Sequence, residues 1–491
     1  MRRRQPRFSL WSAHHLLLLT SAAVVAATSR GPGPAPPASN ACNASTPSKR
    51  AAADAPNIAL VLCDDLDLQL GGMTPLKKAR RLLSDGGATA TKWFIHTPVC
   101  CPSRGELLTG RYFHNVRIAT PNAGHQCMFI DIESDGVGGR FYDDYYFAPH
   151  LQQAGYTVGI FGKHMNNGNP KCPPPGVDRW MANGGGNYRA PAFSVASAGD
   201  DDGGHSESWS NCSYTNAPGW NNDCYSTSVI GNTSIAWIDA VQATEAADRK
   251  PFFAYIAVKA PHIEDGPGWP VSVPAPWYED AFSPTLRAPR TSNWNVTYPD
   301  HHWLIRQQPP MTMEQAEKSD ALYRTRWQAL LSVDDLVADV VSAVERATAA
   351  NGRKGYVIFS SDHGYRFGQF RMPQGKWNVY ENDISIPWLI MGPGITKGSN
   401  FSHIASQVDT MPTILGLAGV DTPSTMDGRS LAPLLLSAAL DEAPSTARAH
   451  VARERALGRG THATWRTEQL VEYYGLGPVI RYGVFLFTVT F

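Results

Sequence analysis

The chain has 491 residues, which is long enough for a large α/β core with a smaller appended domain. Its 43 lysines and arginines are balanced by 43 aspartates and glutamates. This balance leaves no global basic excess, so the composition argues against a nucleic-acid partner, and any affinity for anions must be local.

The first residues have the pattern of a secretory signal peptide, which we place at residues 1–28. Arginines at positions 2, 3, 4 and 7 precede an apolar run from Leu16 to Ala27, and small residues follow. That run is too short, and its flank too rich in proline, for a stable membrane span, and no later stretch is apolar over enough residues. We expect residues 29–54 to form a flexible leader.

Glycosylation motifs and cysteines also indicate export. We therefore expect a secreted, extracellular, N-glycosylated protein, or one sent to a lysosomal or periplasm-like compartment. All eight cysteines lie in the first half of the chain, where disulfides would pin loops. Cys212 and Cys224 are one candidate pair, but the spacing leaves the connectivity open. The five N-x-S/T acceptors are Asn43, Asn211, Asn232, Asn295 and Asn400.

Short apolar runs alternate with helical patterns along the chain. The runs at 57–63, 156–161, 251–258 and 356–360 predict strands, and 148–155 and 313–350 predict helices. The longer helix keeps a 3.6-residue apolar rhythm with one polar break, at Asp334. This alternation predicts a large, mostly parallel sheet sandwiched by helices. The polar stretch 195–225 predicts a long surface excursion, and its Asp200–Asp202 run fits a solvated loop better than a cation site.

Chemically active residues follow each predicted strand. Since ligands bind outside the carboxyl ends of strands in α/β sheets, these residues should share one rim. The carboxylates favour a divalent cation, calcium rather than zinc. A role as a helix N-cap would explain Asp64 and Asp65 alone, but it would not explain the matching pair Asp362 and His363. The residues are Asp64 and Asp65, Lys163, His262, and Asp362 with His363.

Basic residues add a second expectation for the same rim. Together, Arg104, Lys163, His262 and Lys376 would make an electropositive pocket for a tetrahedral oxyanion. On charge grounds alone, such a pocket suits phosphate and sulfate esters equally well.

The stretch from Cys100 to Arg111 reads CCPSRGELLTGR and resembles the signature of type I sulfatases, C-x-P-S-R followed by L-T-G-R. In that family the first cysteine is oxidised to formylglycine (3-oxoalanine), which here would be Cys100, with Cys101 at the variable position. The hydrated aldehyde offers one hydroxyl to attack sulfur and a second to release sulfate. Two merely buried or disulfide-bonded cysteines would leave Pro-Ser-Arg unexplained.

The resemblance covers roughly residues 55–482 and is strongest to the branch of N-acetylglucosamine-6-sulfatases, extracellular endosulfatases and algal arylsulfatases. It rests on the segments HHWLIRQ (301–307), RWQALLSVDDLV (326–337), MDGRSLAPLLL (426–436) and WRTEQLVEYYG (465–475). It implies an alkaline-phosphatase-like sulfatase fold, with a catalytic domain at 55–440 and a partial, truncated C-terminal subdomain at 441–491. It also implies a formylglycine-generating enzyme as a partner during maturation.

Site roles follow from the resemblance. Arg104 would hold the formylglycine hydrate, Lys163 would contact sulfate, and His262 and Lys376 would flank the leaving oxygen. Two positions depart from relatives: Met165 replaces a common histidine, and Arg366 replaces a histidine that should face the substrate. The implied calcium (Ca2+) ligands are Asp64, Asp65, Cys100, Asp362 and His363.

We therefore predict a secreted sulfuric ester hydrolase of N-acetylglucosamine-6-sulfatase type, acting on a glycosaminoglycan or another sulfated polysaccharide. The alternative within the family is an arylsulfatase of broad specificity that hydrolyses aryl sulfates. Two rivals remain open at this point. One is a phosphate-ester hydrolase, usually with two zinc ions, and the other is an inactive homologue that only binds sulfated glycans.

Overall fold

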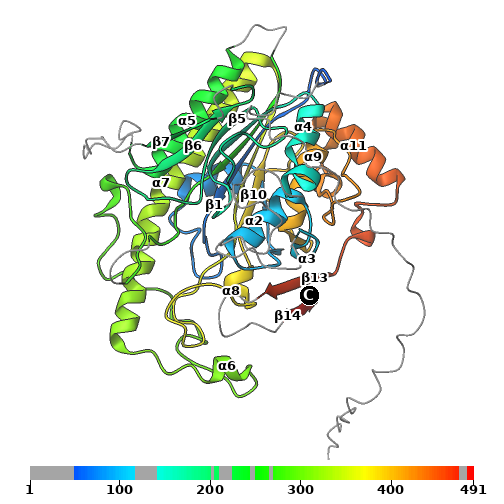
Figure 1. The fold of residues 1–491 in the computed structure, drawn as a ribbon. Coiled ribbons are helices and arrows are strands. Elements are labelled where there is room, and N and C mark those ends of the chain that lie inside the picture. The colour runs from blue at the N-terminus through cyan, green and yellow to red at the C-terminus, as the bar shows by residue number, and fades with distance from the viewer. Residues whose placement is uncertain are drawn as a thin grey trace, which may run out of the picture. The chain divides into compact units, whose positions relative to one another are not determined.

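The computed structural model describes residues 49–116, 141–167, 169–200, 204–208, 224–243, 249–264, 269–474 and 484–490. The predicted signal peptide, most of the leader, and Asn43, Asn211 and Cys212 lie outside these ranges. The described part is built on a ten-stranded sheet (Figure 1). Its strands, in spatial order, are β11 (Ser399–Phe401), β2 (Ala88–Ala90), β10 (Trp388–Met391), β9 (Gly355–Ser361), β1 (Asn57–Cys63), β8 (Phe252–Ala257), β4 (Thr157–Lys163), β5 (Arg179–Asn183), β6 (Ala192–Ser197) and β7 (His205–Ser208).

The centre of the sheet is parallel and its flanks are mixed. β1 pairs in parallel with both β8 and β9, and β4 pairs in parallel with β8 and β5. The four predicted strands are confirmed: β1 has the predicted ends, and the ends of β4, β8 and β9 are shifted by one or two residues. β10, β6 and β7 run antiparallel to their neighbours. The prediction that 195–225 is a surface excursion is wrong at its start, because β6 reaches Ser197 and β7 pairs beside it.

Successive residues of β1 alternate between two buried apolar clusters, one on each face of the sheet. The even-numbered residues from 58 to 62 join the first cluster, and the odd-numbered residues from 59 to 63 join the second. The strand is fully buried along its length. Burial on both faces explains why its sequence is continuously apolar rather than alternating.

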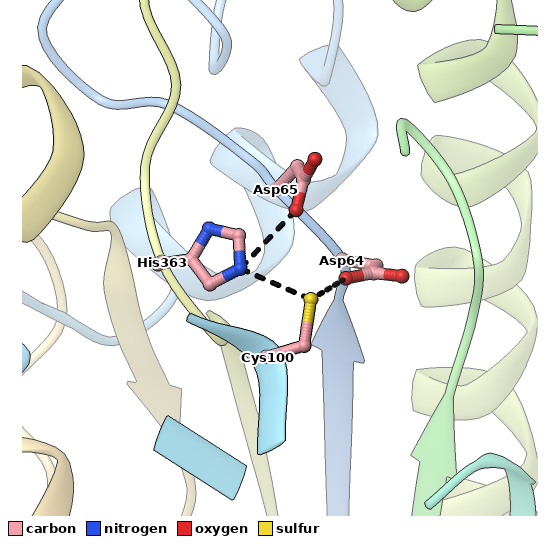
Figure 2. Close-up of side chains that lie close together, drawn as sticks. All are labelled: Asp64, Asp65, Cys100 and His363. Atoms are coloured by element: carbon pink, nitrogen blue, oxygen red, sulfur yellow. Dashed lines mark hydrogen bonds and ion pairs between the residues drawn. The ribbon is translucent and has the colours of Figure 1, made fainter. Parts of the chain in front are cut away.

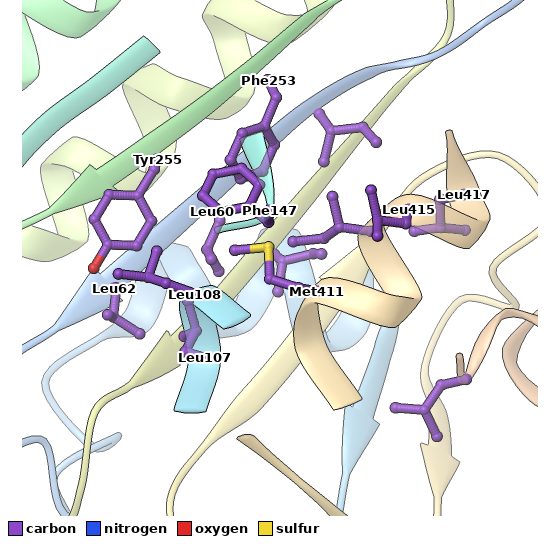
Figure 3. Packing of buried hydrophobic residues seen from close by; sticks show 14 of the residues in the cluster. Leu60, Leu62, Leu107, Leu108, Phe147, Phe253, Tyr255, Met411, Leu415 and Leu417 are labelled. Atoms are coloured by element: carbon purple, nitrogen blue, oxygen red, sulfur yellow. The ribbon is translucent and has the colours of Figure 1, made fainter. Parts of the chain in front are cut away.

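Helices cover both faces of the sheet, as Figure 1 shows. In Figure 3, Leu108 of α2 and Met411 of α9 pack with Leu60 of β1 and Phe253 of β8. α5 and α7 cover the opposite face and contribute to the second cluster. The helices are α1 (Lys77–Ala79), α2 (Cys100–Thr109), α3 (Phe113–Val116), α4 (Ala148–Gln153), α5 (Ser226–Gln242), α6 (Trp303–Arg306), α7 (Met313–Asn351), α8 (Glu381–Ile384), α9 (Thr410–Leu417), α10 (Ala432–Leu435) and α11 (Ser445–Ala456).

The long helix α7 confirms the prediction for 313–350 and explains its polar break. A capping box between Thr312 and Gln315 starts the helix, and Gly352 in a left-handed conformation ends it. The carboxylate of Asp334 accepts hydrogen bonds from the backbone amides of Lys78 and Ala79, at 2.9 and 2.8 Å. The polar break therefore fixes α1 against α7. Within the described residues, no helix combines the length and apolarity needed to cross a bilayer.

The segment after residue 440 contains α11, which packs on α9 and α10, and a two-stranded antiparallel sheet. That sheet pairs β13 (Glu468–Tyr474) with β14 (Val484–Thr490). The amide of Glu472 in β13 donates to the carbonyl of His96 at 2.9 Å, which ties this segment to the loop before α2. The subdomain boundaries remain predictions. Short strands β3 (Trp93–Phe94) and β12 (Ala405–Ser406) form a further pair.

Candidate active site

The carboxyl ends of four adjacent strands meet at one rim of the sheet, in the order β9, β1, β8 and β4. Asp64 follows β1, Asp362 follows β9, His262 lies shortly after β8, and Lys163 is the last residue of β4. Because these strands are parallel, their residues converge on one rim, as the strand pattern predicts. Gly162 allows the close approach: a Cβ there would lie 2.0 Å from the carbonyl oxygen of Ala257.

Cys100 is the first residue of α2, and its thiol lies at the centre of the rim. The Sγ atom is 3.5 Å from Asp64 Oδ1, 3.3 Å from His363 Nε2 and 3.2 Å from Lys376 Nζ. Figure 2 shows the side chains of Asp64, Asp65, Cys100 and His363 pointing toward one another. The side chain is 2% exposed and sits at the positive end of a ten-residue helix. That position favours negative charge on the residue or on a bound anion.

The two adjacent cysteines have different states. Cys100 is a free, buried thiol, whereas Cys101 is disulfide-bonded. Cys172 and Cys224 are also disulfide-bonded, and Cys63 is a second free, buried thiol. Cys101, at the variable position of the motif, is therefore part of a disulfide bond, whereas Cys100 keeps a free thiol.

Four side chains could hold a metal ion: Asp64, Asp65, Cys100 and His363 offer atoms that all lie within 4.8 Å of one another. Asp65 Oδ2 is buried and has no hydrogen-bond donor in the described residues, so a cation would satisfy it. The carboxylates suit calcium, whereas a thiol is a soft ligand. The set therefore fits calcium best once the sulfur of residue 100 is replaced by oxygen.

Asp362 lies beside this group but outside it. Its Oδ1 accepts from the backbone amides of Asp65 and His363, both at 2.9 Å. Its Oδ2 accepts from Arg104 Nε at 3.0 Å. In this arrangement Asp362 holds the loop of Asp65 and the guanidinium of Arg104, and its role as a direct calcium ligand remains a prediction.

Two lysines neutralise the aspartates. Lys163 Nζ donates to Asp64 Oδ2, and Lys376 Nζ donates to Asp65 Oδ1 at 2.5 Å. Burial alone would raise the pKa of each carboxyl, but the neighbouring cations outweigh this effect. Lys163 makes the largest contribution among them and holds the pKa of Asp64 well below its usual value. Lys376 and His262 lower the pKa of Asp65 to about 2. Both carboxylates are therefore ionised at physiological pH.

The same attraction keeps the lysines charged. Burial opposes it, but Asp65 raises the pKa of Lys376 well above its usual value, and Asp64 raises the pKa of Lys163. Arg104 Nη2 is buried, has no hydrogen-bond acceptor in the described part of the chain, and lies 3.7 Å from Asp64 Oδ1. His262 is the most open member of the group, with 22% of its side chain exposed and Nε2 3.8 Å from Asp65 Oδ2. The structure thus brings the four predicted cationic side chains together at this rim.

The two departures from relatives have structural explanations. Met165 is fully buried in the core, and His164 beside it packs among aromatic rings, with Nε2 3.0 Å from the hydroxyl of Tyr146. Burial lowers the pKa of His164 to about 3, so this histidine does not stand in for the missing one. Arg366, which we expected to face the substrate, is only 6% exposed and pairs with Asp383. The expectation that it faces the substrate stays a prediction.

Sequence reasoning missed two supporting residues. Arg326 of α7 is 1% exposed and donates to the carbonyls of Asp65 and, at 3.0 Å, Pro261. Tyr255 of β8 accepts from Arg104 Nη1 at 3.2 Å. A charged residue within the apolar rhythm of 313–350 was the available signal for Arg326. Tyr255 gave none, because it looks like any aromatic residue in a buried strand.

The chain is similar to known proteins over most of its length. The sulfatase family profile matches residues 56–420. Human N-acetylglucosamine-6-sulfatase is 34% identical over 432 residues, which cover 86% of this chain and 68% of the human protein. A putative extracellular sulfatase Sulf-1 homolog of Caenorhabditis elegans is 32% identical over 380 residues, or 77% of this chain and 49% of that protein.

Among solved structures, a protein in complex with its substrate D-glucosamine-2-N,6-O-disulfate superposes with a TM-score of 0.62. The two share 20% identity over 89% of this chain and 87% of that one, so this likeness concerns the fold alone. It confirms the predicted alkaline-phosphatase-like α/β fold. The family profile and the named relatives favour sulfate esters as the substrate class. The chain therefore belongs to the sulfatase family, whose members hydrolyse sulfate esters.

Proposed function

We propose that this sulfatase removes 6-O-sulfate from N-acetylglucosamine units of a glycosaminoglycan or related polysaccharide. The observation that carries the proposed chemistry is the free thiol of Cys100 in contact with Asp64, His363 and Lys376. The N-acetylglucosamine-6-sulfatase relatives support the substrate class. Aryl sulfates form the competing substrate class, as in the arylsulfatase relatives.

The proposed cofactors are calcium, held by Asp64, Asp65, His363 and residue 100, and formylglycine made from Cys100. Bound calcium would polarise the sulfate ester, and formylglycine would supply the attacking hydroxyl. Asp362 is a candidate fifth ligand, since its Oδ1 lies 3.6 Å from His363 Nε2. A formylglycine-generating enzyme would act on the chain before α2 is buried, because Cys100 is 2% exposed in the fold.

The remaining catalytic roles are proposed for side chains of the protein. Arg104 Nη2, which is buried and has no hydrogen-bond acceptor in the described residues, would donate to the hydroxyls of residue 100. The ammonium groups of Lys163 and Lys376 would balance the negative sulfate oxygens. Lys376 and His262 lie on the side of Asp65 and are the candidates that protonate the leaving sugar oxygen. Burial of Arg104, Lys163 and Lys376 keeps bulk water from screening their charges.

Export and glycosylation belong to the same proposal. The extracellular sulfatase relatives support a secreted protein. Among the acceptor asparagines that the structure describes, Asn400 in β11 is exposed, whereas Asn232 and Asn295 are half-buried. Asn295 also accepts a hydrogen bond from the amide of Met311 at 2.7 Å. We therefore expect Asn400 to carry the glycan most completely.

The test combines mass analysis with turnover. Purified protein should show formylglycine at position 100 by peptide mass, and should release inorganic sulfate from N-acetylglucosamine-6-sulfate. The Cys100→Ala variant should stay folded and lose turnover, whereas Cys63→Ala, which removes the other free buried thiol, should keep it. An intact thiol at Cys100 in active protein would refute the mechanism. A protein that binds sulfated glycans without releasing sulfate would support the inactive homologue.

A further inference from the structure

We propose that Trp377 binds the sugar unit next to the sulfated one, so that the enzyme prefers sulfated oligosaccharides to small sulfate esters. This inference rests on the proposed function, since it takes a sulfated polysaccharide as substrate. Trp377 directly follows Lys376, whose Nζ is 3.2 Å from Cys100 Sγ. Lys376 is 6% exposed and Trp377 is 53% exposed. The side chain of Lys376 thus enters the anion site, and the side chain of the next residue in the chain is exposed at the surface.

The backbone of Trp377 is in an unfavourable conformation. Its φ angle is +78°, in the left-handed region, where a bulky aromatic residue is an outlier. Two nearby residues of the same loop, Phe370 and Arg371, also have positive φ angles, of +55° and +63°. Each such residue costs about 1–3 kcal/mol and persists only where its surroundings hold it. Conformations of this kind cluster at ligand sites.

A buried ion pair holds the peptide groups on both sides of Trp377. Arg366 Nη2 donates to the carbonyl of Lys376 at 2.8 Å, and Asp383 Oδ2 accepts from the amide of Asn378 at 2.7 Å. Arg366 and Asp383 pair with each other, and Asp383 is fully buried. The same pair therefore sets the direction of Lys376 into the site and the position of Trp377 at its edge.

Indole offers a large flat apolar surface and one N–H donor. A pyranose ring presents a flat face of C–H groups with hydroxyls at its edge, so it complements both features. The turn alone does not call for tryptophan, because glycine would adopt this φ angle with less strain. The indole ring, rather than the backbone conformation, is therefore what Trp377 contributes here.

The experiment compares Trp377→Gly with the wild type on three substrates: an aryl sulfate, N-acetylglucosamine-6-sulfate, and a tetrasaccharide carrying 6-O-sulfated N-acetylglucosamine. Glycine removes the ring and relieves the backbone, so the variant should melt no lower than the wild type. Its KM for the tetrasaccharide should rise about tenfold, and far more than its KM for the monosaccharide. Trp377→Phe should retain most of the preference. Leu457→Ala, which removes an exposed apolar side chain at the end of α11, should change none of these values.

Two results would overturn the inference while leaving the proposed function intact. One is an unchanged tetrasaccharide KM in Trp377→Gly, and the other is an equal loss on all three substrates, which would mean that Trp377 acts through Lys376. A different result would contradict the proposed function itself. In that case the wild-type protein would hydrolyse the aryl sulfate but neither of the sulfated sugars. The wild-type data and the variant data therefore separate the two failures.

Discussion

Glu106 in the middle of α2 should make the stability of the protein fall as pH rises, and Glu106→Gln should remove that effect. The side chain is fully buried, and its Oε1 accepts from the hydroxyl of Thr97 at 3.0 Å. Burial and the neighbouring carboxylate of Glu472 together raise the pKa of Glu106 well above its usual value, and they outweigh its hydrogen bonds. Glu472 is itself buried and pairs with His114 Nδ1 at 2.6 Å.

The sign follows from proton binding. Because the folded-state pKa is raised, the folded protein holds this proton more tightly than the unfolded chain. The stabilisation is complete below the unfolded pKa, near 4.5, and is lost as pH rises toward the folded pKa. A single group of this kind changes the free energy of unfolding by about 1.4 kcal/mol per pH unit within that window. Glutamine imitates the protonated acid at every pH, so the variant should gain that amount over the wild type for each unit above 4.5.

The measurement is the melting temperature of both proteins at pH 4.5, 5.5 and 6.5 with calcium held constant. At this size, 1 kcal/mol corresponds to on the order of 2 °C. The matched control is Glu314→Gln at an exposed carboxylate in the first turn of α7, which should leave the pH profile unchanged. Parallel profiles for the wild type and Glu106→Gln would show that Glu106 is ionised in the folded protein, and the reasoning would fail.

Three further predictions use other parts of the structure. Arg366→Lys should lower kcat about tenfold for aryl and sugar sulfates alike, because lysine cannot contact Asp383 and the carbonyl of Lys376 together; a change confined to one substrate would contradict this positioning role. Calcium at 100 times its dissociation constant should stabilise the protein by about 2.7 kcal/mol, read as a fall in melting temperature when a chelator is added; equal protection by magnesium would count against the site. His164→Gln should lessen the loss of stability between pH 6.5 and 4. Burial lowers the pKa of His164 to about 3, so the folded protein loses stability as pH falls through this range. An unchanged dependence of the melting temperature on acid pH would mean that His164 is protonated in the folded protein.

The sequence predicted the centre of the fold well and its edges poorly. The strand at 57–63 was found at its observed ends because both of its faces are buried, which leaves a continuous apolar run. The hairpin of β6 and β7 was missed because β7 is exposed along its whole length, and its polar sequence looks like a loop. Burial on both faces is visible in a sequence, whereas pairing at an exposed edge is not.

The positions of the site residues could be predicted where these residues directly follow a predicted strand. Asp64, Lys163 and His363 needed only the rule that parallel strands deliver their carboxyl ends to one rim. The pairing of Arg366 with Asp383, seventeen residues later, could not be predicted, because no local sequence pattern indicates that partner. The states of Cys100 and Cys101 likewise depend on distant chain segments, which is why spacing alone left them open.

Arg326 links parts of the molecule that are far apart in sequence. Its guanidinium binds the carbonyl of Asp65 after β1 and that of Pro261 just before His262, from the second quarter of a 39-residue helix. The separation between Asp65, a proposed calcium ligand, and His262, a proposed proton donor, therefore depends on Arg326, which has no proposed contact with substrate or ion. Substitutions along the outer surface of α7 that tilt the helix would widen or narrow this gap, so activity should be sensitive to changes well outside the pocket.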